Sequence, residues 1–160
     1  MTQSVYVETT VISYLAARPS RDVIIKAHQE VTHAWWLKRR DDFELFVSDL
    51  VLEELSRGDK PAAARRLSYV RHLNSAPSTE PAIGLARLML KQKAVPAVAQ
   101  VDALHISIAA VHGADYLLTW NCRHIANAEM RVKIGAVCRN AGYEPPIICT
   151  PEELMGDSNA

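Results

Sequence analysis

This sequence has no net charge, no long apolar run and only three cysteines. Its 18 basic and 18 acidic side chains cancel, which argues against binding nucleic acid through overall charge, because such binding grows with the number of Lys and Arg contacts to phosphate. Charges or prolines interrupt every apolar stretch before the ~20 residues of a membrane-spanning helix. Residues 1–3 lead directly into a strand-like run, so we expect neither a secretory signal nor a membrane segment.

The cysteine count points to a reducing compartment. Three cysteines without a C-x-x-C pair favour free thiols over a disulfide framework, and we therefore expect a cytoplasmic protein. These residues are Cys122, Cys138 and Cys149.

Several catalytic patterns are missing as well. None of the six histidines has the spacing of a zinc site, and neither a Ser-His-Asp set nor a Gly-rich phosphate loop can be recognised. What is present is a chain of 160 residues that is 49% apolar, which suits one buried core. We expect a single domain over residues 1–155 and a flexible tail over 156–160.

Short β-branched and aromatic runs predict strands, and apolar residues at three- and four-residue steps predict helices. Helical patterns separate the strands, which excludes hairpins. We therefore expect a three-layer α/β/α fold with a short, mostly parallel sheet of four or five strands. The predicted strands are 4–7, 44–48, 114–119 and 146–150. The predicted helices are 11–17, 20–40, 49–57, 62–73, 81–92, 101–112, one from about 122, and 128–140, with a turn at 74–79.

Polar residues follow the ends of the predicted strands, where ligands bind in open parallel sheets. Glu8 follows the first strand, Glu53 and Glu54 lie in the helix after the second, and Asn121 follows the strand near 116. Asp102 opens an apolar helix, where it caps the helix or points into a shared cleft. Because several carboxylates at one edge repel each other, a hard cation such as Mg²⁺ is the usual partner.

Four segments resemble, in order, the elements of the PIN domain family. Residues 5–12 (VYVETTVI) look like its opening strand and turn, and residues 47–55 (VSDLVLEEL) like its second element, where a Glu precedes a Leu. Residues 102–110 (DALHISIAA) look like the third element and residues 115–121 (DYLLTWN) like the fourth. The resemblance implies a metal-dependent ribonuclease, most often the VapC-type toxin of a bacterial toxin-antitoxin pair, which a small antitoxin protein holds inactive.

The resemblance also implies residue roles. Catalysis and the binding of one or two Mg²⁺ or Mn²⁺ ions would fall to Glu8, Glu54, Asp102 and Asn121. Thr10 and Thr119 are further candidates for contact with the RNA substrate. Independently of the resemblance, Arg123 and His124 are expected to meet the RNA because they stand at the start of the helix predicted from about 122, where phosphate groups bind readily. His105, one turn after Asp102, either shares the cleft or lies in the core with one nitrogen bonded, and we favour the core.

The sequence departs from the family pattern in three places. The first acid is Glu8 rather than Asp, Thr10 stands two residues later, and Asn121 stands where an acid is frequent. Fewer charges weaken binding of a second metal ion. Two alternatives therefore stay open: a PIN-like RNA-binding or regulatory module with weakened or absent catalysis, and an unrelated α/β hydrolase or phosphatase.

Helix 20–40 is the predicted partner surface. We expect Ser20 to cap it and Trp36 to lie outside its buried stripe, so that exposed apolar residues here would suit a homodimer contact or an antitoxin groove. The buried stripe is predicted as Val23, Ile24, Ala27, Val31, Ala34, Trp35 and Leu37.

Overall fold

A computed structural model, which describes residues 1–157, contains a five-stranded sheet in the order β3-β2-β1-β4-β5. Every neighbouring pair is parallel, with Tyr6 opposite Phe46 on one side and Leu117 on the other. The three-layer α/β prediction is confirmed. The strands are β1 (Ser4–Val7), β2 (Glu44–Ser48), β3 (Asn74–Ala76), β4 (Tyr116–Leu118) and β5 (Ile147–Cys149).

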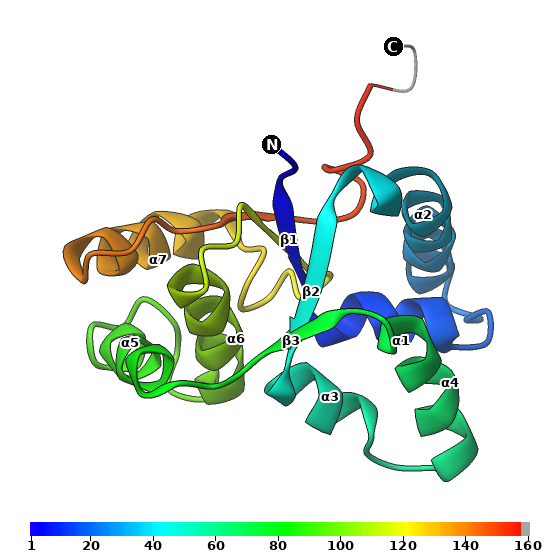
Figure 1. Ribbon diagram of the computed structural model, residues 1–160, viewed down its shortest axis with the longest axis horizontal. Coiled ribbons are helices and arrows are strands. Elements are labelled where there is room, and N and C mark those ends of the chain that lie inside the picture. Colours follow the sequence, from blue (N-terminus) through cyan, green and yellow to red (C-terminus); the bar gives the residue numbers. More distant parts are fainter. Residues whose placement is uncertain (158–160) are drawn as a thin grey trace.

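Helices cover both faces of this sheet. In Figure 1, α1, α2 and α4 lie on one side of the strands, and α5, α6 and α7 lie on the other. The helices are α1 (Thr9–Ala16), α2 (Val23–Arg39), α3 (Asp49–Leu55), α4 (Lys60–Val70), α5 (Glu80–Lys91), α6 (Gln100–Val111) and α7 (Ala128–Asn140), with a short 3-10 turn, η1 (Arg40–Asp42), after α2. Within residues 1–157, none of the helices is long and apolar enough to cross a membrane.

The central strand β1 determines where the site forms. Val5, Tyr6 and Val7 are fully buried, as expected for a strand covered on both faces. α1 starts directly after β1 and α3 directly after β2, so the residues at these junctions gather at one edge of the sheet. Residues 158–160 of the predicted tail at 156–160 lie outside the described part of the chain.

Two predicted elements differ from the structure. Residues 74–76 form the edge strand β3 rather than part of a turn, because Asn74 and Ser75 pair with β2 despite their polarity. No helix begins at Cys122: the Asn121 carbonyl accepts hydrogen bonds from the backbone of Ile125 and Ala126, which closes a tight turn, and Asn127 caps α7 instead.

The buried face of α2 also differs from the prediction. Val23, Ile24 and Leu37 are exposed, whereas Trp36 is buried. Polar contacts rotate the helix away from the predicted stripe: the Gln29 side chain accepts from the Ser20 amide and donates to the Arg18 carbonyl, and the Thr32 hydroxyl accepts from the Trp120 indole. Asp22 rather than Ser20 caps α2.

Candidate active site

Glu8 lies inside the protein, between the end of β1 and the start of α1. Its side chain is only 4% exposed and caps α1 through the Thr10 amide at 3.0 Å. Its other oxygen accepts the hydroxyls of Thr10, at 2.7 Å, and Thr119. Three donors therefore occupy the Glu8 carboxylate, which satisfies its charge in the interior.

Thr10 and Thr119 connect Glu8 to the backbone that follows β4. The Thr10 hydroxyl accepts from the Trp120 amide, and the Thr119 hydroxyl accepts from the Asn121 amide, both at 2.9 Å. Each threonine thus donates to Glu8 and accepts from an amide beyond β4. The two predicted substrate contacts serve here to hold the ends of β1 and β4 together.

Glu54 faces the same edge from α3 and is about 23% exposed. One oxygen, Oε1, accepts the Thr9 hydroxyl at 2.7 Å and lies 2.6 Å from His105 Nε2. Burial pushes the pKa of Glu54 upward, but the bonds from His105 and Thr9 outweigh it and lower the pKa below its usual value. The neighbouring Glu53 is exposed and pairs with Arg57 at 2.8 Å, as expected for the other of two adjacent acids on a helix.

Asp102, in the first turn of α6, bonds to side chains rather than capping its own helix. Its two oxygens lie 3.0 Å from Asn121 Nδ2 and 3.0 Å from His124 Nδ1. The Asn121 carbonyl oxygen of the side chain accepts the His124 amide, which fixes the turn after β4. Asn121 therefore presents its amide nitrogen, a donor, to Asp102.

These contacts form two hydrogen-bonded paths at the carboxyl ends of β1 and β4, and the backbone of the β1–α1 junction and of α6 joins them into one ring. One path runs from Glu8 through Thr119 and Asn121 to Asp102, and the other from Thr9 through Glu54 to His105. Glu8 and Thr9 are neighbours in the chain, and Asp102 and His105 lie one turn apart on α6. The structure thus brings together all four predicted site residues. From the sequence, Thr9 was expected to be a turn or capping hydroxyl and was not counted among the site residues. His105 was expected in the core without its bond to Glu54, and the one signal for it was a histidine in an apolar helix.

The ring has to supply free oxygen donors if it is to bind Mg²⁺ or Mn²⁺. Within residues 1–157, no three His, Cys, Asp or Glu side chains gather closely enough to hold an ion. Glu54 and Asp102 are partly exposed oxygen donors, and Mg²⁺ is commonly bound by one or two carboxylates with water and substrate phosphate. Glu54 and Asp102 fit such a site, whereas Glu8 is occupied by its own hydrogen bonds.

Arg123 and His124, which follow Asn121 in the chain, differ in whether they are free to contact a ligand. Arg123 is exposed, and no acid within residues 1–157 forms an ion pair with it. His124 is turned toward Asp102. Asp115, at the opposite end of β4, accepts from the Ser4 amide at 2.8 Å and therefore lies away from the ring.

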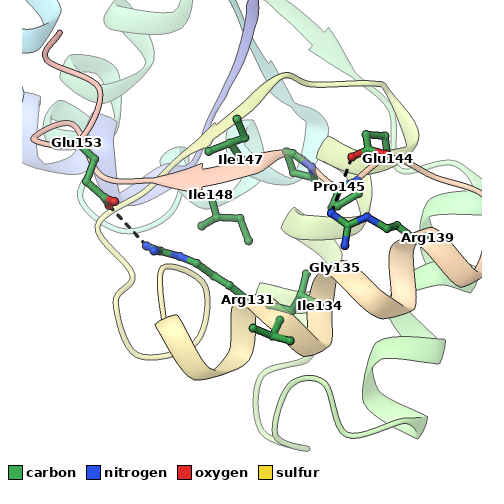
Figure 2. Close-up of a pocket in the computed structure, with 11 residues that line it drawn as sticks. Arg131, Ile134, Gly135, Arg139, Glu144, Pro145, Ile147, Ile148 and Glu153 are labelled. Carbon is green, nitrogen blue, oxygen red and sulfur yellow. Dashed lines mark hydrogen bonds and ion pairs between the residues drawn. The ribbon is translucent and has the colours of Figure 1, made fainter.

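A separate hollow lies between α7 and the edge strand β5 (Figure 2). Arg131 pairs with Glu153 at 3.5 Å, and Arg139 with Glu144 at 3.9 Å, on either side of Ile148. None of the ring residues lines this hollow. The hydrogen bonds that Glu8, Glu54 and Asp102 make to neighbouring Thr, Asn and His residues, rather than this hollow, therefore define the candidate site.

The fold and the ring together define a class: a parallel α/β domain whose acids gather where the central strands end. The family model described as PIN domain matches residues 5–128. The chain belongs to the PIN domain family.

A solved structure shows the same fold. A chain in the crystal structure of VapBC2 from Rickettsia felis, bound to a DNA fragment from their promoter, superposes with a TM-score of 0.61 at 16% identity, covering 92% of this chain and 98% of that chain. A search of curated proteins found no match.

Proposed function

We propose that the protein is a Mg²⁺- or Mn²⁺-dependent endoribonuclease that hydrolyses RNA phosphodiester bonds. The single observation behind this proposal is the ring formed by the two hydrogen-bonded paths, which gathers Glu8, Glu54, Asp102 and Asn121 at the strand ends of a PIN domain. Acids so placed in an open parallel sheet lie where ligands bind.

Glu54 and Asp102 would hold the ion. A bound divalent ion polarises a phosphoryl oxygen and lowers the pKa of a coordinated water, which supplies a nucleophile at neutral pH. Either carboxylate can accept the proton from the attacking water. Asn121 would act by holding Asp102 in place, and Glu8 by holding the ends of β1 and β4 through Thr10 and Thr119.

Arg123 and His124 would meet the RNA backbone. Arg123 is exposed in the turn after β4, two residues after Asn121, whose side chain bonds to Asp102. A guanidinium donates paired hydrogen bonds to phosphate and suits this contact. His124 would reach the substrate only from the Asp102 side, where its ring already bonds.

The proposed biological role is that of a toxin in a bacterial toxin-antitoxin pair, acting on RNA in the cytoplasm. Support comes from the VapC-like sequence elements and from the fold shared with the VapBC2 chain. A small antitoxin protein or a second copy of the chain would cover exposed apolar residues of α2, namely Val23, Ile24 and Leu37.

Two observations favour a second function, an RNA-binding or regulatory module without catalysis. The Glu8 carboxylate is occupied by three protein donors, and Asn121 presents a nitrogen to Asp102 where an acid would add charge. Both reduce the negative charge available to a cation.

The experiment that separates these functions is RNA cleavage by the purified chain, free of any antitoxin, with Mg²⁺, Mn²⁺ or EDTA. Duplex DNA and a small phosphate ester serve as comparison substrates. Metal-dependent cleavage of RNA supports the nuclease. Binding of RNA without cleavage supports the regulatory module, and turnover of the small ester alone indicates an unrelated phosphatase.

A further inference from the structure

Tyr6 and Ser48 lie beneath the ring and connect to it at His105, and none of these three buried polar side chains has a part in the proposed reaction. Ser48, Tyr6 and His105 are each at most 1% exposed. They form a chain of contacts: Tyr6 Oη lies 2.8 Å from Ser48 Oγ and 2.7 Å from His105 Nδ1. The chain ends at Glu54, whose Oε1 lies 2.6 Å from His105 Nε2. Burying three polar groups is costly unless each one is satisfied.

For a neutral His105 imidazole, one arrangement of protons satisfies every atom of this chain. The Glu54 carboxylate only accepts, so His105 Nε2 must carry the proton and donate it. His105 Nδ1 is then an acceptor and takes the Tyr6 hydroxyl. Ser48 Oγ accepts the Val51 amide at 3.1 Å, so its own hydroxyl can donate to Tyr6. Burial also raises the pKa of Tyr6 above its usual value, which keeps this hydroxyl a donor.

This chain of donors fixes one carboxylate oxygen of Glu54 and not the other. His105 and Thr9 both bond to Oε1. Within residues 1–157, no group is hydrogen-bonded to Oε2. A carboxylate held in this way is oriented before any ligand arrives, and its second oxygen is available to a cation.

His105 also connects the two proposed metal ligands. It lies on α6 one turn after Asp102 and bonds across to Glu54 on α3. The position of Glu54 relative to Asp102 therefore depends on this histidine.

We propose that His105 is a positioning residue for divalent-metal binding: its Nε2–H holds Glu54 so that Oε2 is presented to the ion, and Tyr6 and Ser48 fix the tautomer that donates. The inference rests on the proposed function, because it concerns the ion that Glu54 and Asp102 would hold. Partners that orient a metal ligand typically contribute 10- to 100-fold to metal affinity.

The test is calorimetric titration of Mn²⁺ into the EDTA-treated, dialysed protein. His105→Leu, which removes the donor, should raise the Kd for Mn²⁺ by about 10- to 100-fold. His105→Gln, which restores an N–H donor at the end of the side chain, should bind more tightly than the leucine variant. Tyr6→Phe should weaken binding by less than His105→Leu, because the imidazole remains but its tautomer is no longer fixed.

The matched control is Ser107→Ala, a buried change on the same helix whose hydroxyl bonds to the Met89 sulfur at 3.7 Å. It should bind Mn²⁺ like the parent. A folded His105→Leu variant with parental Mn²⁺ affinity overturns the inference, while RNA cleavage by the parent would leave the proposed function intact.

If His105→Leu does not fold, Tyr6→Phe decides, and parental affinity in that folded variant overturns the role of the chain. A parent that binds no Mn²⁺ and cleaves no RNA instead contradicts the proposed function, and the inference with it.

Discussion

Replacing Glu8 with glutamine separates the folding role of this acid from any metal role. The carboxylate accepts three hydrogen bonds, from the Thr10 amide, the Thr10 hydroxyl and the Thr119 hydroxyl, and it is 4% exposed. In Glu8→Gln the amide oxygen can still accept the two hydroxyls, but the –NH₂ group then faces the Thr10 amide, a donor against a donor. The helix cap is lost and a buried donor is left unsatisfied.

The cost of Glu8→Gln follows from that single mismatch. An unsatisfied buried donor costs about 1–3 kcal/mol. For a chain of this length each kcal/mol lowers Tm by roughly 2–4 °C. The assay is urea and thermal unfolding in EDTA, so that no metal contributes. Glu53→Gln is the control, since Glu53 is exposed and paired only with Arg57, and its effect should stay within about 0.5 kcal/mol. A Glu8→Gln variant as stable as the parent would refute the reasoning.

Three further predictions follow from the same contacts. Asn121→Asp should lower the stability in EDTA by about 1–3 kcal/mol, because it replaces the amide that donates to Asp102 with a second carboxylate. The added charge should also tighten Mn²⁺ binding roughly tenfold, and unfolding with and without Mn²⁺ measures both effects. One thiol of the native protein and three of the unfolded protein should react with an aromatic disulfide reagent. Cys122 is exposed, whereas burial raises the pKa of Cys138 to about 11 and of Cys149 to about 12. Reaction of all three thiols in the native protein would contradict the burial of Cys138 and Cys149. Asp49→Asn should destabilise the protein at pH 7 and match the parent in acid. Burial pushes the pKa of Asp49 upward, but the hydrogen bonds from Ser78 outweigh it and hold the pKa below 3.8. The stability that Asp49 contributes is therefore present above pH 3.8 and is lost as the pH falls through the folded pKa, and urea midpoints at several pH values measure this loss.

The order of elements and the location of the acids could be predicted because both depend on local signals. A strand that ends in Glu8 and another that leads to Asn121 place these residues at one edge of any parallel sheet. The preference for Glu54 over Glu53 agrees with the structure, in which Glu54 faces the ring and Glu53 faces solvent. Their catalytic roles stay predictions.

The rotation of α2 could not be predicted, because distant partners set it. Thr32 is buried by its bond to Trp120, and Gln29 by its bonds to Ser20 and Arg18. Neither partner is visible in the spacing of apolar residues, which therefore favoured the wrong face. The prediction of a helix from about residue 122 was wrong because polar groups again set the local structure. The side chain and the backbone carbonyl of Asn121 close a turn there, which apolar periodicity does not reveal.

The structure also changes how Glu8 is interpreted. The sequence placed it among the metal ligands, whereas in the structure Thr10 and Thr119 occupy its carboxylate. The Glu8 side chain folds back onto the start of its own helix, where it accepts the Thr10 amide. This geometry depends on two threonines that lie far apart in the sequence.

The most direct test of the nuclease proposal is the rate of RNA cleavage by the parent, Asp102→Asn and the control Glu53→Gln in Mg²⁺, Mn²⁺ and EDTA. The account predicts that the parent and Glu53→Gln cleave only with metal, and that a folded Asp102→Asn loses at least about 100-fold in rate, as expected when a metal ligand is removed. Cleavage by Asp102→Asn at the parental rate would contradict the assignment of the active site.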